Sequence, residues 1–226
     1  MPKNNKHKRA KKIMNIAQIV LSIVAAYLIG SIPVAYLIGR LHGVNVFEIG
    51  SRNMGASNIS RAVSRPWGGI TWFLDSSKGI IAILVVRQIM PDDQQTLATM
   101  IGAVVVIIGH VWSIFVRFII GEFRGGKGAA TTIGTWFLFM PLPIVVLILA
   151  LWLLILYVTK FISLTVLSTL TLMSLIIIGM VATHRLELVH LSYLIVTVII
   201  FYRHQSNIQA LLAGRERRIS DAKPAG

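Results

Sequence analysis

Long uncharged stretches dominate this chain and are separated by short polar segments. Residues 13–39, 97–116, 128–159 and 161–183 contain no Asp, Glu, Lys or Arg. A helix needs about 20 apolar residues to cross the roughly 30 Å hydrocarbon core of a bilayer, and each of these runs is long enough. Helices are expected because the runs lack alternating polarity and because lipid cannot satisfy an open strand. The pattern predicts an all-α, polytopic integral membrane protein.

The 128–159 run is too long for a single crossing and contains two helix breakers. Pro141 and Pro143 each lack a backbone donor and disfavour the helical conformation in the preceding residue, so the run is predicted to divide there. The fourth span is then short and begins at the Gly-Gly-Lys-Gly segment at 125–128. The seven predicted spans are 13–40, 67–90, 95–118, 128–140, 142–159, 161–183 and 186–204.

Composition and charge narrow the class further. Of the 226 residues, 55% are hydrophobic and 13% are charged, which excludes a soluble globular domain and a disordered chain. The 22 Lys and Arg outnumber the 8 Asp and Glu, but they lie at span ends and in tails, so membrane lipids and not nucleic acid are the predicted partner. The absence of cysteine excludes disulfides and thiolate chemistry. We predict one membrane domain at 13–208 between basic tails at 1–12 and 209–226, with no particular oligomeric state indicated.

Basic residues alternate between the connections. Segments 40–65, 117–127 and 203–223, together with Lys160, carry most of the Lys and Arg, whereas the intervening connections carry few. The positive-inside rule therefore places the basic connections in the cytoplasm. By parity the tail at 1–12 then lies outside, although it is also basic. That tail resembles a signal peptide, but the apolar run after it is too long for one.

The first polar segment that could bind an anion covers residues 50–61 and reads G-S-R-N-M-G-A-S-N-I-S-R. Gly50 and Gly55 permit a tightly turned backbone whose N–H groups can point at an anion. Short hydrogen-bonding side chains and two guanidinium groups accompany them. These side chains are Ser51, Asn53, Ser57, Asn58, Arg52 and Arg61. The alternative is an ordinary polar turn, which uses the same residue types.

A second segment, Arg124-Gly125-Gly126-Lys127-Gly128, opens the predicted fourth span. Glycines before a helix leave backbone donors exposed, and the helix dipole favours negative charge there. The segment is not a Walker A motif, which needs a different spacing after a strand. The alternative is a helix end with a membrane-flanking lysine.

The remaining candidates are ionisable residues near or inside spans. His204 and Asn207 are three residues apart, so a helix would place them on one face, and a histidine can carry a proton near neutral pH. An interface histidine is the alternative. Asp75 and Lys78 are predicted to pair within a span, in a structural role. His110 is predicted to be buried and hydrogen-bonded where helices pack closely at the preceding glycine.

Several arrangements are absent from the sequence. No histidine is followed five residues later by Asp, so the H-x-x-x-x-D pattern of acyl-CoA-dependent glycerolipid acyltransferases is missing. A G-x-S-x-G nucleophile elbow and an acidic cluster for Mg²⁺ are missing too, so no metal or cofactor is predicted. A small organic-anion transporter or exporter remains an alternative, but it would place binding groups near the bilayer midplane and often show inverted repeats.

Taken together, six ordered motifs resemble the bacterial acyl-phosphate:glycerol-3-phosphate acyltransferases, the PlsY family, over about residues 20–219. They are Gly30-Ser31-Ile32-Pro33, G-S-x-N-x-G-A-[ST]-N-x-x-R at 50–61, L-D-x-x-K-G at 74–79, Gly109-His110, F-[KR]-G-G-K-G at 123–128 and Y-R-H-x-x-N-I-x-x-L-L-x-G-x-E at 202–216. The chain departs from the family pattern at Arg52, where glycine is usual, at Gln205-Ser206, and at Val166, where the family has a serine.

The resemblance implies a seven-helix enzyme of the bacterial inner membrane with its site on the cytoplasmic side. It would transfer a fatty acyl group from acyl phosphate to the 1-hydroxyl of sn-glycerol 3-phosphate, giving lysophosphatidate for phospholipid synthesis. The residues carried over as catalytic are Ser51, Arg61, Lys127, His204 and Asn207. Phosphate or substrate binding is expected from Gly50, Asn53, Gly55, Ser57, Asn58, Arg124, Gly125, Gly126 and Gly128, and from Ser163, which matches a family serine. His204 and a phosphate oxygen of the substrate are the two candidates for the base.

Overall fold

The computed structural model describes residues 15–219, and within that range the regular secondary structure is entirely helical. The predicted basic tail at 1–12 lies outside the described residues. Five apolar helical segments are long enough to cross a membrane. They are Ile16–Leu41, Arg65–Ile89, Asp92–Ile120, Leu142–Thr159 and Ile162–Ala182. The prediction of an all-α protein with several apolar spans is confirmed.

The first and third of these segments are composite. The first contains α1 (Ile16–Ser31) and α2 (Val34–Leu41), which are separated at Pro33. The third contains the short 3₁₀ helix η1 (Asp92–Gln94), α5 (Gln95–Val111) and α6 (Ile114–Ile120). The other three are single helices, namely α4 (Arg65–Ile89), α8 (Leu142–Thr159) and α9 (Ile162–Ala182).

The two remaining predicted spans are also helical, but neither is a single helix long enough to cross the membrane. The fourth is α7 (Ala129–Phe139), whose 11 residues extend only about 16 Å, less than the hydrocarbon core. The last consists of the 3₁₀ helix η2 (Leu188–Tyr193), α10 (Leu194–Arg203) and α11 (Gln205–Leu212), with a bend of 58° before α11. Seven crossings therefore stay a prediction, although all seven predicted segments contain helix.

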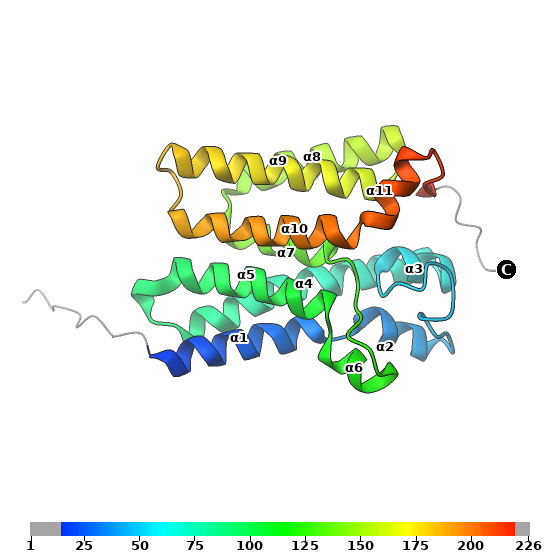
Figure 1. The fold of residues 1–226 in the computed structure, drawn as a ribbon, viewed down its shortest axis with the longest axis horizontal. Helices are drawn as coiled ribbons and strands as arrows, with labels where there is room; N and C mark the ends of the chain where they lie inside the picture. Colours follow the sequence, from blue (N-terminus) through cyan, green and yellow to red (C-terminus); the bar gives the residue numbers. More distant parts are fainter. Residues whose placement is uncertain (1–14, 220–226) are drawn as a thin grey trace, which may run out of the picture.

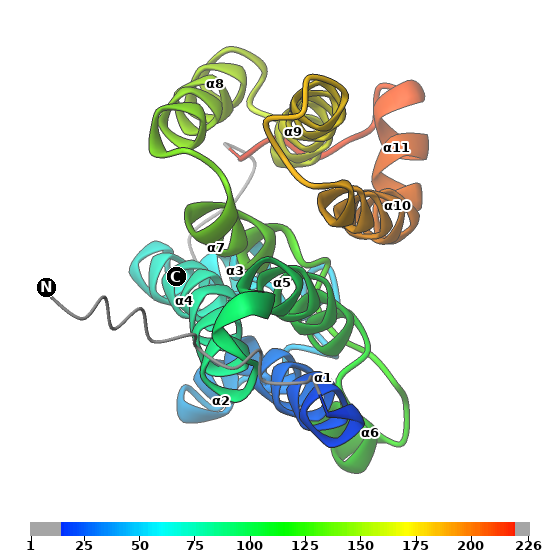
Figure 2. The same cartoon turned by 90° about the vertical axis from the view of Figure 1, so that its left-hand side faces the viewer.

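The helices form two groups (Figures 1 and 2). Figure 2 shows α8, α9, α10 and α11 gathered on one side and α1, α2, α4 and α5 on the other, with α7 between them. A hydrogen bond of 3.1 Å between Thr135 and Tyr193 connects α7 to η2. The main apolar core includes side chains from both groups, such as Ile107, Trp136 and Leu170.

Close backbone contact holds α1 against α5. A Cβ atom placed on Gly109 would lie 2.2 Å from the carbonyl oxygen of Tyr27, so only glycine fits there. The neighbouring His110 is 3% exposed, and its Nδ1 atom lies 3.2 Å from the hydroxyl of Thr131. Both observations confirm the prediction of a buried, hydrogen-bonded histidine beside a closely packed glycine.

The predicted ion pair inside α4 is also present. The Nζ atom of Lys78 lies 2.9 Å from the carboxylate of Asp75, and both residues are buried. Lys78 also donates a 3.2 Å hydrogen bond to the carbonyl of Ile32, next to the break between α1 and α2. Lys78 of this pair thus satisfies the Ile32 carbonyl, which the break in the first segment leaves without a helical partner. The contact agrees with the structural role predicted for the pair.

A smaller apolar cluster supports the polar end of the molecule. It joins α2, α6 and the segment between α2 and α4 through side chains that include Val46, Phe47, Met54, Ile59 and Val116. The short helix α3 (Ala56–Ala62) belongs to this region. Figure 1 shows α3 and α11 at the same end of the long helices. The fold therefore brings the first and last polar motifs to one end of the bundle.

Candidate active site

The first polar segment is organised around the buried side chain of Asn58. Its Oδ1 atom accepts a hydrogen bond of 3.0 Å from the backbone N–H of Ser51. Its Nδ2 atom donates to the carbonyls of Val46, at 3.1 Å, and Ile49, at 3.3 Å. All three partners belong to the segment before α3. Asn58 therefore fixes the shape of this loop.

Two residues of this loop have left-handed backbone conformations. Gly50 has φ of +59° and Arg52 has φ of +53°. A side chain other than glycine pays about 1–2 kcal/mol for that conformation. The carbonyl of Arg52 accepts a 2.6 Å hydrogen bond from the guanidinium of Arg124, which ties the first loop to the second. Arginine thus occupies a position whose backbone adopts a conformation that favours glycine.

The predicted loop ends earlier than its motif suggests. Gly55 is the N-cap residue of α3, with extended backbone, so Ser57, Asn58 and Arg61 lie on a helix. Seven residues are too few to show a 3.6-residue apolar period, so sequence periodicity could not identify this helix. Ser51 is exposed, and Asn53, Ser57 and Arg61 are half-buried.

The second segment passes directly over the end of α5. Gly125 and Gly126 are buried against His110, and a Cβ on Gly126 would lie 2.1 Å from the imidazole Nε2 atom. Gly128 has φ of +88° and is the N-cap of α7. The helix therefore begins at the Gly-Gly-Lys-Gly segment, as predicted. Lys127 is half-buried, and its Nζ atom donates a hydrogen bond to Oδ1 of Asn207. The second and third motifs therefore meet at Lys127.

The contact at Lys127 continues into a polar network. Nδ2 of Asn207 donates to the carboxylate of Glu216 at 2.8 Å, and the hydroxyl of Ser163 donates to the same carboxylate oxygen at 2.8 Å. The network joins the second loop, α11, the segment after it and the start of α9. Glu216 is the last residue of the motif at 202–216, and the sequence pattern alone indicates no role for it. A single acid among the arginines at 215–218 was the available signal.

Charge gathers around Lys127. Burial is the main cause that lowers the pKa of Lys127 from 10.5 to about 8. The Glu216 carboxylate opposes this shift, and the nearby cations Arg203 and Arg61 add to it. The amine therefore remains mostly protonated at neutral pH in a region where positive charges repel each other. Such a region favours a bound anion.

His204 lies at the junction between α10 and α11 and is 3% exposed. Its Nδ1 atom is 2.8 Å from the carbonyl of Ile200, and because a carbonyl only accepts, Nδ1 carries a proton. In the neutral ring Nε2 is then the hydrogen-bond acceptor. The helix predicted to carry both His204 and Asn207 is broken at His204. Asn207 lies in the first turn of α11, where the break directs it toward Lys127.

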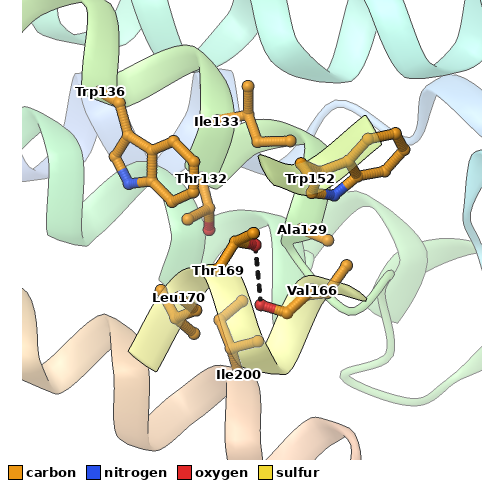
Figure 3. A pocket seen from close by; sticks show the side chains of 9 residues that line it. All are labelled: Ala129, Thr132, Ile133, Trp136, Trp152, Val166, Thr169, Leu170 and Ile200. Carbon is orange, nitrogen blue, oxygen red and sulfur yellow. Dashed lines mark hydrogen bonds between the residues drawn. The ribbon is translucent and has the colours of Figure 1, made fainter. Parts of the chain in front are cut away.

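An apolar pocket lies on the membrane side of these residues (Figure 3). Ala129 follows Gly128, Val166 is one turn after Ser163, and Ile200 is one turn before His204, so three of the lining helices, α7, α9 and α10, connect to the polar site. The enclosed space is about 10 Å³, close to the minimum for one water molecule. The lining residues are Ala129, Thr132, Ile133, Trp136, Trp152, Val166, Thr169, Leu170 and Ile200. The side chain of Val166 keeps this wall apolar.

A larger groove of about 420 Å³ runs between α9 and α10. Its lining is apolar except for hydroxyl groups, and Ser174 and Thr197 hydrogen-bond across it at 2.7 Å. Phe201 lines the end of the groove that is one turn from His204. Among residues 15–219, no three His, Asp or Glu side chains group together as metal ligands would.

Comparison with known proteins assigns the family. The sequence profile described as glycerol-3-phosphate acyltransferase matches residues 20–214. Proteins of that name from Trichlorobacter lovleyi and from Wolbachia pipientis of Culex pipiens are 35% and 32% identical to this chain. Each alignment covers 87% of this chain, with 95% of the Trichlorobacter protein and 96% of the Wolbachia protein.

Solved structures agree with the sequence relatives. The crystal structure of PlsY (YgiH), an integral membrane glycerol 3-phosphate acyltransferase, in its glycerol 3-phosphate form is 29% identical and superposes with a TM-score of 0.75. The alignment covers 88% of this chain and 94% of that one. The lysophosphatidic acid form gives a TM-score of 0.73 at 28% identity over the same shares. The fold, the profile and the ordered motifs agree, and the chain belongs to the glycerol-3-phosphate acyltransferase family of PlsY.

Proposed function

We propose that this protein transfers a fatty acyl group from acyl phosphate to the 1-hydroxyl of sn-glycerol 3-phosphate, giving lysophosphatidate and inorganic phosphate. The observation that carries the proposal is the contact between Lys127 and Asn207. It joins a glycine-rich helix start to the junction that bears His204, in a region where Arg61 and Arg203 add positive charge. Two phosphorylated substrates need such a concentration of cations and backbone donors. The relatives described above are named as acyltransferases, which favours this activity over the transporter alternative.

The chemistry requires no covalent enzyme intermediate. The acceptor's hydroxyl oxygen attacks the acyl carbonyl carbon, and the bond from that carbon to the phosphate oxygen breaks. The departing phosphate takes the bonding electron pair and finally the hydroxyl proton. Lys127 and Arg61 would stabilise the negative charge on this phosphate, a role worth about 10²-fold or more in rate. Ser51 and Asn53 would orient the phosphate from the first loop.

His204 is the proposed carrier of the hydroxyl proton. Its Nδ1–H is held by the Ile200 carbonyl, which leaves Nε2 free to accept a proton. Transfer directly to the departing phosphate would give the same products. Asn207 would hold Lys127 in position through its side-chain carbonyl.

The acyl chain would lie in the groove between α9 and α10. The groove is apolar and of a size typical for ligand sites, and it ends at Phe201 near His204. The phosphate end of the donor would then reach Lys127 while its tail stayed at membrane depth. The basic connections support a site on the cytoplasmic side of a bacterial inner membrane.

The test uses the full-length protein purified in detergent, with labelled glycerol 3-phosphate as acceptor. Palmitoyl phosphate should support lysophosphatidate formation, and activity should persist in EDTA. Palmitoyl-CoA alone should give no product. Turnover with palmitoyl-CoA alone, or complete loss of activity in EDTA, would overturn the proposed donor and mechanism.

A further inference from the structure

Arg203 is a charged residue of the third motif to which no role has been assigned. It occupies the last turn of α10, directly before His204, and its side chain is half-buried. One guanidinium nitrogen, Nη2, donates a 3.3 Å hydrogen bond to the carbonyl of Gly125. The Nε atom is buried and has no hydrogen-bond partner among the described residues. A guanidinium has five N–H donors, so most of the hydrogen-bonding capacity of Arg203 is not explained by Gly125.

Arg203 lies beside the glycine-rich loop and near two other cations. Gly125 is two residues before Lys127, so the guanidinium lies beside the glycine-rich start of α7. Arg203 and Arg61 both act electrostatically on Lys127, which places three cations around one loop. A buried donor without a partner is costly, and native structures usually supply that partner. If Arg203 served only to hold the Gly125 carbonyl, one neutral donor would be enough. That role does not explain why three cations lie close together.

The charge of the substrates indicates what the missing partner is. A phosphate monoester carries roughly −1.5 to −2 at neutral pH, so two phosphorylated substrates bring about −3 to −4 into the site. Lys127, Arg61 and Arg124 supply three positive charges, and the Glu216 carboxylate offsets one of them. A planar guanidinium can also hold two phosphate oxygens at once, which an ammonium group cannot.

We propose that Arg203 is a further phosphate-binding residue, whose guanidinium contacts the phosphate group held by the 125–128 loop while one nitrogen retains the Gly125 carbonyl. The proposal rests on the proposed function for the identity of the phosphorylated substrates. The bound phosphate could belong to a phosphate monoester or to an acyl phosphate. The experiment below distinguishes these two substrates.

The test compares Arg203→Gln and Arg203→Lys with Arg217→Gln, which removes an exposed cation from the same end of the chain. Arg203→Gln keeps an amide donor but loses the charge, and Arg203→Lys keeps the charge but loses the planar fork. Arg203→Gln should raise the KM of one phosphorylated substrate by about 10-fold or more, as expected when a buried charge loses its partner. Arg203→Lys should give a smaller increase, and Arg217→Gln should leave both KM values unchanged.

The substrate whose KM rises identifies the phosphate that Arg203 contacts, glycerol 3-phosphate or palmitoyl phosphate. Equilibrium binding of inorganic phosphate to the same detergent-purified proteins provides a readout independent of turnover. Unchanged phosphate affinity and unchanged KM values in folded Arg203→Gln or Arg203→Lys would overturn the proposal. If the wild-type protein does not use palmitoyl phosphate, the proposed function fails, but weaker phosphate binding by the Arg203 variants would still support this site.

Discussion

The first loop and the region around Lys127 meet at one end of the molecule, but they are held together in different ways. The first loop is shaped from within, by the buried Asn58 side chain and the apolar cluster beneath it. The region around Lys127 depends on polar contacts between distant segments, from Lys127 through Asn207 to Glu216. One region is therefore a preformed surface, whereas the other is an assembly of charged groups whose state follows pH and ligand. Substitutions in the two regions should therefore have different effects on activity and on stability.

The largest effect is expected at Lys127. Lys127→Ala should lower kcat/KM by about 10²-fold or more because the amine stabilises charge on the departing phosphate. The unfolding temperature in detergent should change little. Arg185→Ala, which removes an exposed cation near the opposite helix ends, is the matched control and should retain activity. Near-normal turnover of Lys127→Ala would instead make the lysine a headgroup anchor.

His204 and Asn207 should behave as one unit with Lys127. His204→Ala and Asn207→Ala should each reduce turnover at least about 10-fold, and the double variant should be little worse than the poorer single variant. Gln205 is exposed, so Gln205→Ala should leave turnover unchanged. Rate measurements on all four proteins test this. Independent, multiplicative losses would show that the two residues act separately.

Asn58 should show the opposite behaviour, with a loss of stability as the main effect. Asn58→Ala removes one buried and two part-buried hydrogen bonds at about 1 kcal/mol each. The unfolding temperature should fall by about 6–12 °C for a chain of this size. Asn207→Ala should lower it much less. A normal unfolding temperature for Asn58→Ala would remove the distinction between the two regions.

The pH dependence should belong to the region around Lys127 alone. Because the pKa of Lys127 is about 8 and not 10.5, the charge that attracts phosphate is present below pH 8 and lost above it. The kcat/KM should therefore fall as pH rises through about 8. Stability should rise over the window between the two values, since there the unfolded chain binds the proton that the folded chain has released. Lys127→Arg should flatten the activity profile, and an unchanged midpoint would assign the titration elsewhere.

The smallest effect is expected at Arg52. Arg52→Gly relieves about 1 kcal/mol of left-handed strain, partly offset by the greater freedom of glycine in the unfolded chain. A gain of about 0.5 kcal/mol should appear as a slightly higher unfolding temperature, with normal activity. Arg52→Ala keeps a Cβ atom and should show no gain. The hydrogen bond from Arg124 goes to the backbone and should survive both changes.

The sequence predicted the helices well because long apolar runs leave the backbone few alternatives in lipid. The buried Asp75–Lys78 pair and His110 were predicted for the same reason, since an ionisable group at that depth needs a partner. The sequence did not indicate the break at Pro33, because the uncharged run continues across it from residue 13 to residue 39. The predicted last span ended at 204, but the sequence did not show that the chain bends there into the further helix α11. It also missed the role of Glu216, whose partners lie 9 and 53 residues away. Contacts at such separations depend on tertiary packing and leave no periodic signal.

The ion pair in α4 has a consequence for the biosynthesis of this protein. The Arg65–Ile89 segment has a mean hydropathy of 1.5, the lowest among the five long segments. An aspartate or lysine at the centre of an isolated helix costs about 2.5–3.5 kcal/mol on insertion. The Asp75–Lys78 pair within α4 recovers part of this cost, and the hydrogen bond from Lys78 to the Ile32 carbonyl recovers more only when the first segment is beside α4. Insertion of α4 should therefore be coupled to its association with the segment at 16–41, and glycosylation reporters should show poorer insertion when that segment is removed.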